Sequence, residues 1–246
     1  MELVKPSIAL PASTTAFTTT RVGGISEGRY RGLNLAQHVD DDKYAVDENR
    51  RRLVTVGGLP NSPLWMNQVH GTVIIDANEV NKSDIVSADG AYVCEPSIVL
   101  AVLSADCLPI VIWDERGREL AVVHGGWKGL LHGVIGAAVS RFDSSPVRLA
   151  AWIGPGISQD AYIVDHSFRQ RFVEYDSSLK NSFVADGERW RADLKDIAMY
   201  LLKQSGIATV EIYNGCTFND ADRFYSYRRD KTTGRMATLA WLSTGP

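Results

Sequence analysis

The pattern of hydrophobic and polar positions predicts buried strands with amphipathic helices between them. Apolar runs with little alternation, typical of strands buried on both faces, occupy residues 98–103, 108–113, 120–123 and 149–153. We expect further strands at 64–66, 73–75, 210–213 and 236–242, and two short strands between residues 14 and 39. Apolar residues recur at helical spacing over 42–56, 127–142, 167–175 and 192–204. Strands and helices that are interspersed without strict alternation favour an α+β, or mixed α/β, fold.

Length and composition are those of an ordinary globular protein. The chain has 246 residues, of which 45% are hydrophobic and 22% are charged. No linker, internal repeat or low-complexity tract divides it. We therefore expect residues 1–246 to form a single domain.

The charge balance argues against a nucleic-acid partner. The formal net charge is −3, whereas a duplex-binding protein usually carries a concentrated basic excess. The basic clusters are Arg50–Arg52 and the run from Arg228 to Lys231, and each is either a solvated surface or an anion site.

Hydropathy and cysteine content indicate a cytoplasmic protein. The longest apolar runs fall far short of the roughly 20 residues of a membrane span, and residues 1–12 lack the pattern of a signal or transit peptide. We expect no membrane partner. Three cysteines do not make a disulfide framework. In a reducing compartment each is free for packing, catalysis or metal binding.

Two histidines and one cysteine lie where an apolar strand gives way to a polar or glycine-containing turn. His70 precedes Gly71, Cys107 lies between two predicted strands, and His124 precedes two glycines. Strand-end loops are common positions for ligand-binding groups. Two imidazoles and a thiolate suit Zn²⁺, and three protein ligands leave a fourth position for water, whose pKa the metal lowers toward about 7. The spacing alone is weak support, because a lone buried cysteine or a loop histidine is more often structural.

Other polar residues near these turns are candidates for secondary roles. Asp106 either orients a ligating imidazole or caps the break between strands. Lys128, after Gly125-Gly126-Trp127, and the adjacent backbone N–H groups can receive an anion. Asn34 and Gln68 contact either substrate or their own backbone.

The ordered motifs of the chain resemble those of the laccase-domain, or YfiH, family, which is also described as purine nucleoside phosphorylases and as peptidoglycan-editing factors. The matching segments run through nearly the whole chain. They are 21–26, 32–39, 49–50, 68–71, 105–109, 123–129, 153–157, 216–217 and 224–230. Small departures occur at Gly90, Gly125 and Lys128. Because Lys128 lacks the bidentate fork of the arginine usual in the family, an anion contact there would differ.

The resemblance implies a zinc site whose ligands match His70, Cys107 and His124, with copper as a possible substitute. It also implies a layered sandwich of mixed β-sheets with helices packed outside. Family members are linked to phosphorolysis of adenosine, inosine and methylthioadenosine, and to deamination of adenosine. Others are linked to removal of a wrong amino acid from a cell-wall precursor.

These activities need different surroundings for the same metal. Phosphorolysis requires an anion pocket, for which Arg21, Arg50 and Lys128 are candidates, with Asn34 and Gln68 for ribose or base contacts. A nucleoside favours a small aromatic pocket that includes Trp127. An amidase acting on a UDP-muramyl precursor favours a wide basic groove around Arg228, Arg229 and Lys231.

Two further alternatives remain open at this point. The family's older label is copper-dependent polyphenol oxidase, but the chain has five histidines and no His-x-His pair for a multicopper cluster. A single copper site with Met66 as axial ligand is the most this sequence offers. In the other alternative the metal is structural and the protein only binds partners. In that case Cys94, Cys216 or Asp106 would complete a four-ligand shell.

Overall fold

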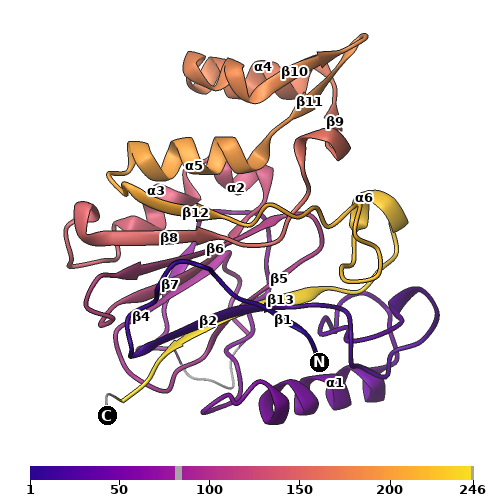
Figure 1. The fold of residues 1–246 in the computed structure, drawn as a ribbon, viewed down its shortest axis with the longest axis vertical. Helices are drawn as coiled ribbons and strands as arrows, with labels where there is room; N and C mark the ends of the chain where they lie inside the picture. Colours follow the sequence, from indigo (N-terminus) through magenta and orange to yellow (C-terminus); the bar gives the residue numbers. More distant parts are fainter. Residues whose placement is uncertain (81–84, 245–246) are drawn as a thin grey trace.

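The computed structural model describes residues 1–80 and 85–244, and it stacks two β-sheets between outer helices (Figure 1). The larger sheet contains β3 (Ile74–Asp76), β4 (Gly90–Val93), β6 (Leu108–Asp114), β7 (Leu120–Gly125), β8 (Leu149–Ile153) and β12 (Thr209–Ile212). Its strand order is β12-β8-β6-β7-β4-β3. The smaller sheet contains β1 (Leu3–Val4), β2 (Thr14–Thr19), β5 (Leu100–Ser104) and β13 (Met236–Leu242), in the order β1-β2-β13-β5.

The core forms where the two sheets face each other and where helices cover their outer faces. All seven residues of β6 are buried, and successive side chains point to opposite faces. Ile110 and Ile112 pack toward the outer helices, whereas Val111 and Trp113 pack toward the smaller sheet. Both faces of β6 are therefore apolar, which explains the lack of alternation in its sequence.

Helices lie outside both sheets. Helices α2 (Trp127–Leu131), α3 (Val134–Val139) and α5 (Leu194–Gln204) cover the larger sheet, and α1 (Lys43–Val56) covers the smaller one (Figure 1). Asp42 and Asp193 cap the first turns of α1 and α5 with their side chains. None of the described helices is long and apolar enough to cross a membrane.

A third sheet lies beyond α5 at the top of Figure 1. It consists of β9 (Ile163–Val164), β10 (Phe183–Asp186) and β11 (Arg189–Ala192), in the order β10-β11-β9. Helix α4 (His166–Tyr175) packs here through Phe168 and Phe172 against Phe183. Short 3-10 helices η1 (Gly28–Tyr30), η2 (Pro146–Arg148), η3 (Gln159–Ala161) and η4 (Ser177–Ser182) complete the connections.

The mixed, layered fold predicted from the sequence is confirmed. Parallel pairs (β12 with β8, β3 with β4) occur beside antiparallel ones in the larger sheet. The predicted helix over 42–56 and the strands over 108–113, 149–153 and 236–242 match α1, β6, β8 and β13 closely.

Three local predictions were wrong. The helix expected over 127–142 is two helices, because Gly133 adopts φ +92° between them. Residues 64–66 form no strand and make a single bridge from Leu64 to Leu100. Between residues 14 and 39, β2 is followed by η1 and an isolated bridge from Ser26 to Gly32, where a second strand was expected.

Candidate metal centre

The fold brings His70, Cys107 and His124 together at one end of the larger sheet. Cys107 lies in the turn between β5 and β6, and His124 lies near the end of β7. The antiparallel register of β6 and β7 pairs Leu108 with Gly125, which places the Cys107 turn beside His124. The three ligand atoms lie within 4.8 Å of one another, and Sγ of Cys107 is 3.9 Å from Nε2 of His70. Among the described residues no fourth histidine, cysteine or acidic side chain joins this group.

The buried carboxylate of Asp89 holds two of these ligands in place. Its oxygens accept backbone N–H bonds from Val69, His70 and Gly71 at 3.2, 2.9 and 2.6 Å. These bonds stabilise the left-handed backbone of His70, at φ +59°. The same carboxylate accepts a hydrogen bond from Nδ1 of His124 at 2.9 Å, which leaves Nε2 of that ring free to bind a metal.

Charge interactions favour the ligating form of the cysteine. Burial raises the pKa of the Cys107 thiol, but the neighbouring His124 and His70 lower it more, to about 6. Burial lowers the pKa of His124, but the Cys107 thiolate and Asp89 raise it to about 9. The metal-free chain therefore holds a thiolate beside an imidazolium at neutral pH. A metal cation that displaces the imidazolium proton can bind the Cys107 thiolate, which is already deprotonated.

The local packing leaves room for a metal ion. A Cβ added at Gly126 would lie 2.8 Å from Cδ2 of His70 and 3.2 Å from Cε1 of His124. Glycine at this position therefore lets both imidazoles approach the thiolate. The donor set, two imidazole nitrogens and one thiolate, matches the preferences of zinc. These residues fit the ion that the sequence predicts.

The three ligands line a cavity of about 630 Å³. Its other walls carry the cations Arg228, Lys231 and Arg235, the aromatic side chains Trp127, Tyr162 and Tyr227, and the polar side chains His38 and Gln68. Such a volume is typical of small-molecule sites. An anion and an aromatic group can be held beside the metal position in the same cavity.

Gln68 lines this cavity, but its amide is engaged with the backbone. Nε2 donates to the carbonyl of Leu103 and Oε1 accepts from the N–H of Leu103, at 2.8 and 2.7 Å. The paired bonds fasten the His70 loop to β5. Gln68 thus acts on the site through the position of its loop.

The other four residues predicted to bind substrate do not line the cavity. Arg21 donates to the carbonyls of Arg31 and Ala221. The Arg50 guanidinium stacks on Trp65 at 4.1 Å and donates to the carbonyl of Leu35.

Asn34 and Lys128 are the other two predicted substrate-binding residues that lie outside the cavity. Asn34 is buried, and its Oδ1 accepts the backbone N–H of Arg235 at 3.0 Å, so it positions a residue that does line the cavity. Lys128 lies in a separate hollow between α2 and α4.

Asp106 joins the Cys107 turn to the C-terminal segment. Its carboxylate accepts hydrogen bonds from Oγ1 of Thr217, Oγ of Ser226 and the backbone N–H of Arg228, at 2.7, 3.0 and 2.6 Å. These bonds tie the Cys107 turn to residues 217–228. The carboxylate that orients an imidazole is Asp89.

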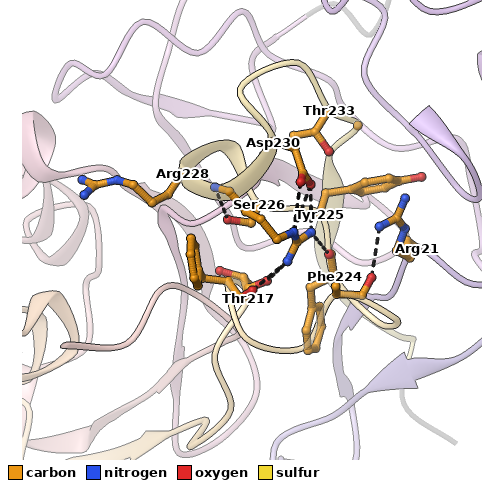
Figure 2. A network of polar contacts seen from close by, with 12 residues as sticks. Arg21, Thr217, Phe224, Tyr225, Ser226, Arg228, Asp230 and Thr233 are labelled. Carbon is orange, nitrogen blue, oxygen red and sulfur yellow. Dashed lines mark hydrogen bonds and ion pairs between the residues drawn. The ribbon is translucent and has the colours of Figure 1, made fainter. Parts of the chain in front are cut away.

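Arg228 and Arg229 are adjacent in sequence but differ in environment. Both belong to the short helix α6 (Tyr227–Asp230). Figure 2 shows the network of polar contacts around Thr217, Phe224 and Asp230 that ties the segment together. Arg229 donates to the carbonyls of Thr217, Phe218 and Phe224 and pairs with Asp230 at 2.9 Å. Arg228 extends away from this network and lines the cavity.

Five residues of this site were not singled out from the sequence: His38, Asp89, Tyr162, Tyr227 and Arg235. His38 stands within a matched motif, and burial together with Arg235 and Arg50 lowers its pKa, so it is neutral at neutral pH. Asp89 directly precedes β4, a strand too short to be recognised from its apolar pattern. A carboxylate at a strand end was the available signal.

Known proteins with this architecture resemble the chain over almost its full length. A family model described as multi-copper polyphenol oxidoreductase laccase matches residues 15–243. A Shigella flexneri protein named purine nucleoside phosphorylase YfiH is 39% identical, over 98% of this chain and 99% of its own. The crystal structure of Neisseria meningitidis protein NMB0706 superposes with a TM-score of 0.94 at 35% identity, covering 98% of this chain and 99% of that one. YlmD from Geobacillus stearothermophilus gives a TM-score of 0.85 at 29% identity, covering 95% and 93%. The chain belongs to the laccase-domain, or YfiH, family.

Proposed function

We propose that the chain is a zinc-dependent purine nucleoside phosphorylase that acts on adenosine, inosine and methylthioadenosine and also deaminates adenosine. The observation that carries this proposal is the shared cavity, in which the His-Cys-His group faces three cationic side chains. The name of the Shigella relative supports the phosphorylase activity. We place the reaction in the cytoplasm, with small molecules as its partners.

Zinc, when bound, supplies a Lewis acid and activates water next to the substrate. His70, Cys107 and His124 hold the ion, and Asp89 fixes the orientation of His124. Because the described residues supply three ligands, the cavity side of the site is left for substrate. That arrangement is typical of catalytic zinc, whereas structural zinc usually has four protein ligands.

The cations of the cavity suit a phosphate ion. Arg228 donates to the carbonyl of Ile163 through one Nη, and Arg235 donates to two carbonyls of its own loop through one Nη. For their remaining N–H groups no acceptor occurs among the described residues. Lys231 adds a third positive charge. Planar guanidinium groups with spare donors bind phosphate oxygens well.

The aromatic side chains suit the nucleoside. Trp127 packs on Phe168 with ring centroids 5.1 Å apart, and Tyr162 packs on the same ring at 5.7 Å. Both therefore present rigid rings to the cavity. A purine has flat apolar faces that stack on the Trp127 ring, while its ribose points toward the cations.

Product analysis by mass spectrometry tests the proposal. Zinc-loaded protein is incubated with adenosine, with and without phosphate, beside a Cys107→Ala variant. Adenine and ribose 1-phosphate formed only with phosphate, and absent with the variant, establish phosphorolysis, whereas inosine establishes deamination. If neither product forms, the proposal fails, and a muramyl-amino-acid substrate is tested next for amide hydrolysis. Oxidation of a phenol by a copper-loaded sample, with no nucleoside turnover by the zinc form, would instead favour the oxidase named in the family description.

A further inference from the structure

Among the described residues, the hydroxyls of the buried and half-buried tyrosines are used in protein hydrogen bonds, with one exception. Six of the nine tyrosines are buried or half-buried. Tyr30, Tyr92, Tyr200 and Tyr225 each donate to a carbonyl or carboxylate, and Tyr213 accepts from Arg223. The sixth, Tyr162, has no partner for its hydroxyl within residues 1–80 and 85–244. The hydroxyl is not fully buried, so it is free to bond to water or to a ligand bound in the cavity.

Tyr162 lines the cavity that holds the His-Cys-His group. It directly follows η3, and its carbonyl accepts the N–H of Ala192 at 3.0 Å. Phe168 packs edge-on to the ring at 5.7 Å, and the Arg228 guanidinium lies over it at 4.7 Å. These contacts fix the ring, and with it the hydroxyl, in the wall of the cavity that His70, Cys107 and His124 also line.

The hydroxyl is suited to donate a hydrogen bond and unsuited to transfer its proton. An ordinary tyrosine has a pKa of about 10 and is already protonated at neutral pH. Burial raises the pKa of Tyr162 further, as do the negative charges of Cys107 and Asp106, although Arg228 opposes this. A general acid works best with a pKa near the working pH. Tyr162 therefore offers a fixed, neutral donor.

Phosphorolysis creates a need for such a donor. A phosphate oxygen forms a bond to C1′ of the ribose while the bond from C1′ to N9 breaks, and the electron pair of that bond passes to the purine. Negative charge builds up on the purine until the proton of the phosphate ends on the released base. A donor placed at the developing charge stabilises the transition state more than the ground state.

We propose that Tyr162 is a catalytic residue whose hydroxyl donates a hydrogen bond to the leaving purine. This inference rests on the proposed phosphorylase activity. Tyr162 lies between η3 and β9, outside the motifs that mark the family in the sequence, and would add a contact to the substrate.

The test compares Tyr162→Phe with wild type on two substrates, adenosine and N7-methyladenosine. The base of the second substrate is cationic, and it leaves as a neutral molecule without negative charge. We expect kcat for adenosine to fall about tenfold or more in the variant, with little change in KM. For N7-methyladenosine we expect less than a twofold change. Phenylalanine keeps the ring contacts, and zinc content measured on both proteins shows whether the metal centre is intact.

Tyr200→Phe is the matched control. Tyr200 lies on α5, away from the cavity, and its hydroxyl donates to the carboxylate of Asp176 at 2.7 Å. The variant removes that hydroxyl. We expect lower thermal stability for this variant and an unchanged kcat. Equal losses of kcat on both substrates in Tyr162→Phe, a change confined to KM, or no loss would each overturn the assignment to the leaving base. If wild type releases no adenine with phosphate, the proposed function itself fails, and the inference about Tyr162 falls with it.

Discussion

Asp89 and His124 are joined by a hydrogen bond of 2.9 Å between a carboxylate oxygen and Nδ1 of the imidazole. The same carboxylate accepts three N–H groups of the His70 loop. One buried side chain therefore sets the tautomer of one candidate metal ligand and the backbone conformation of another. The metal centre depends on this residue although Asp89 does not belong to the group of three ligands.

Replacing Asp89 with asparagine is expected to weaken zinc binding by about 10–100-fold. An amide cannot accept all of these bonds in the same way, and its NH2 group faces donors. Competition with a coloured chelator measures the affinity. Asp114→Asn is the control, since Asp114 is equally buried but accepts N–H groups of Arg116, Arg118 and Glu119 in a remote turn. If both variants bind zinc like wild type, Asp89 does not position the ligands.

The metal-free chain is expected to contain a Cys107 thiolate at neutral pH. The pKa of about 6 means that the ultraviolet absorbance of the thiolate appears as the pH rises through that value. Subtracting the same titration of Cys107→Ala removes the contribution of Cys94 and Cys216. In Asp89→Asn the His124 imidazolium loses a stabilising partner, so the midpoint for Cys107 is expected to move upward. A wild-type midpoint near the ordinary cysteine value of about 8.5 would contradict this electrostatic account.

Phosphate binding is expected to depend on the cations of the cavity. Arg235→Gln and Arg228→Gln should each raise the KM for phosphate about tenfold or more, because each removes a charge-assisted hydrogen bond. Lys128→Gln, in the neighbouring hollow, should change it little. Initial rates at varied phosphate give the comparison. If Lys128→Gln raises the KM for phosphate more than Arg228→Gln and Arg235→Gln do, the anion site lies at Lys128.

Substitutions of Arg229 and of Arg228 are expected to lower the stability of the protein by different amounts. Arg229→Gln breaks bonds to three carbonyls and should lower the free energy of unfolding by about 2–4 kcal/mol. Arg228→Gln loses one such bond, and about 1 kcal/mol or less is expected. Urea unfolding monitored by tryptophan fluorescence distinguishes the two. Equal destabilisation would mean that the network in Figure 2 does not hold the segment together.

The sequence predicted the parts of this protein that local patterns encode. Strands such as β6 and β8 are continuous apolar runs, and α1 ends where Gly57 follows its apolar stripe. The three candidate metal ligands lie at strand ends, and the family resemblance singled them out. Local patterns failed where one residue decided the outcome, as at Gly133 between α2 and α3.

The surroundings of the metal were not predictable from local patterns, because they arise from contacts between distant segments. Asp89 is one of 29 acidic residues, and its role depends on residues 69–71 and His124 folding around it. Arg228 and Arg229 are chemically identical neighbours. Only the three-dimensional path of the C-terminal segment directs one into the cavity and the other into a structural network.

Removal and return of the metal show whether catalysis needs the ion. Chelator-treated protein, still folded by circular dichroism, is expected to lose phosphate-dependent release of adenine from adenosine, and about one equivalent of zinc per chain is expected to restore it. The Cys107→Ala variant should not be restored. Full phosphorolysis by the metal-free chain would contradict the claim that His70, Cys107 and His124 form the catalytic metal site.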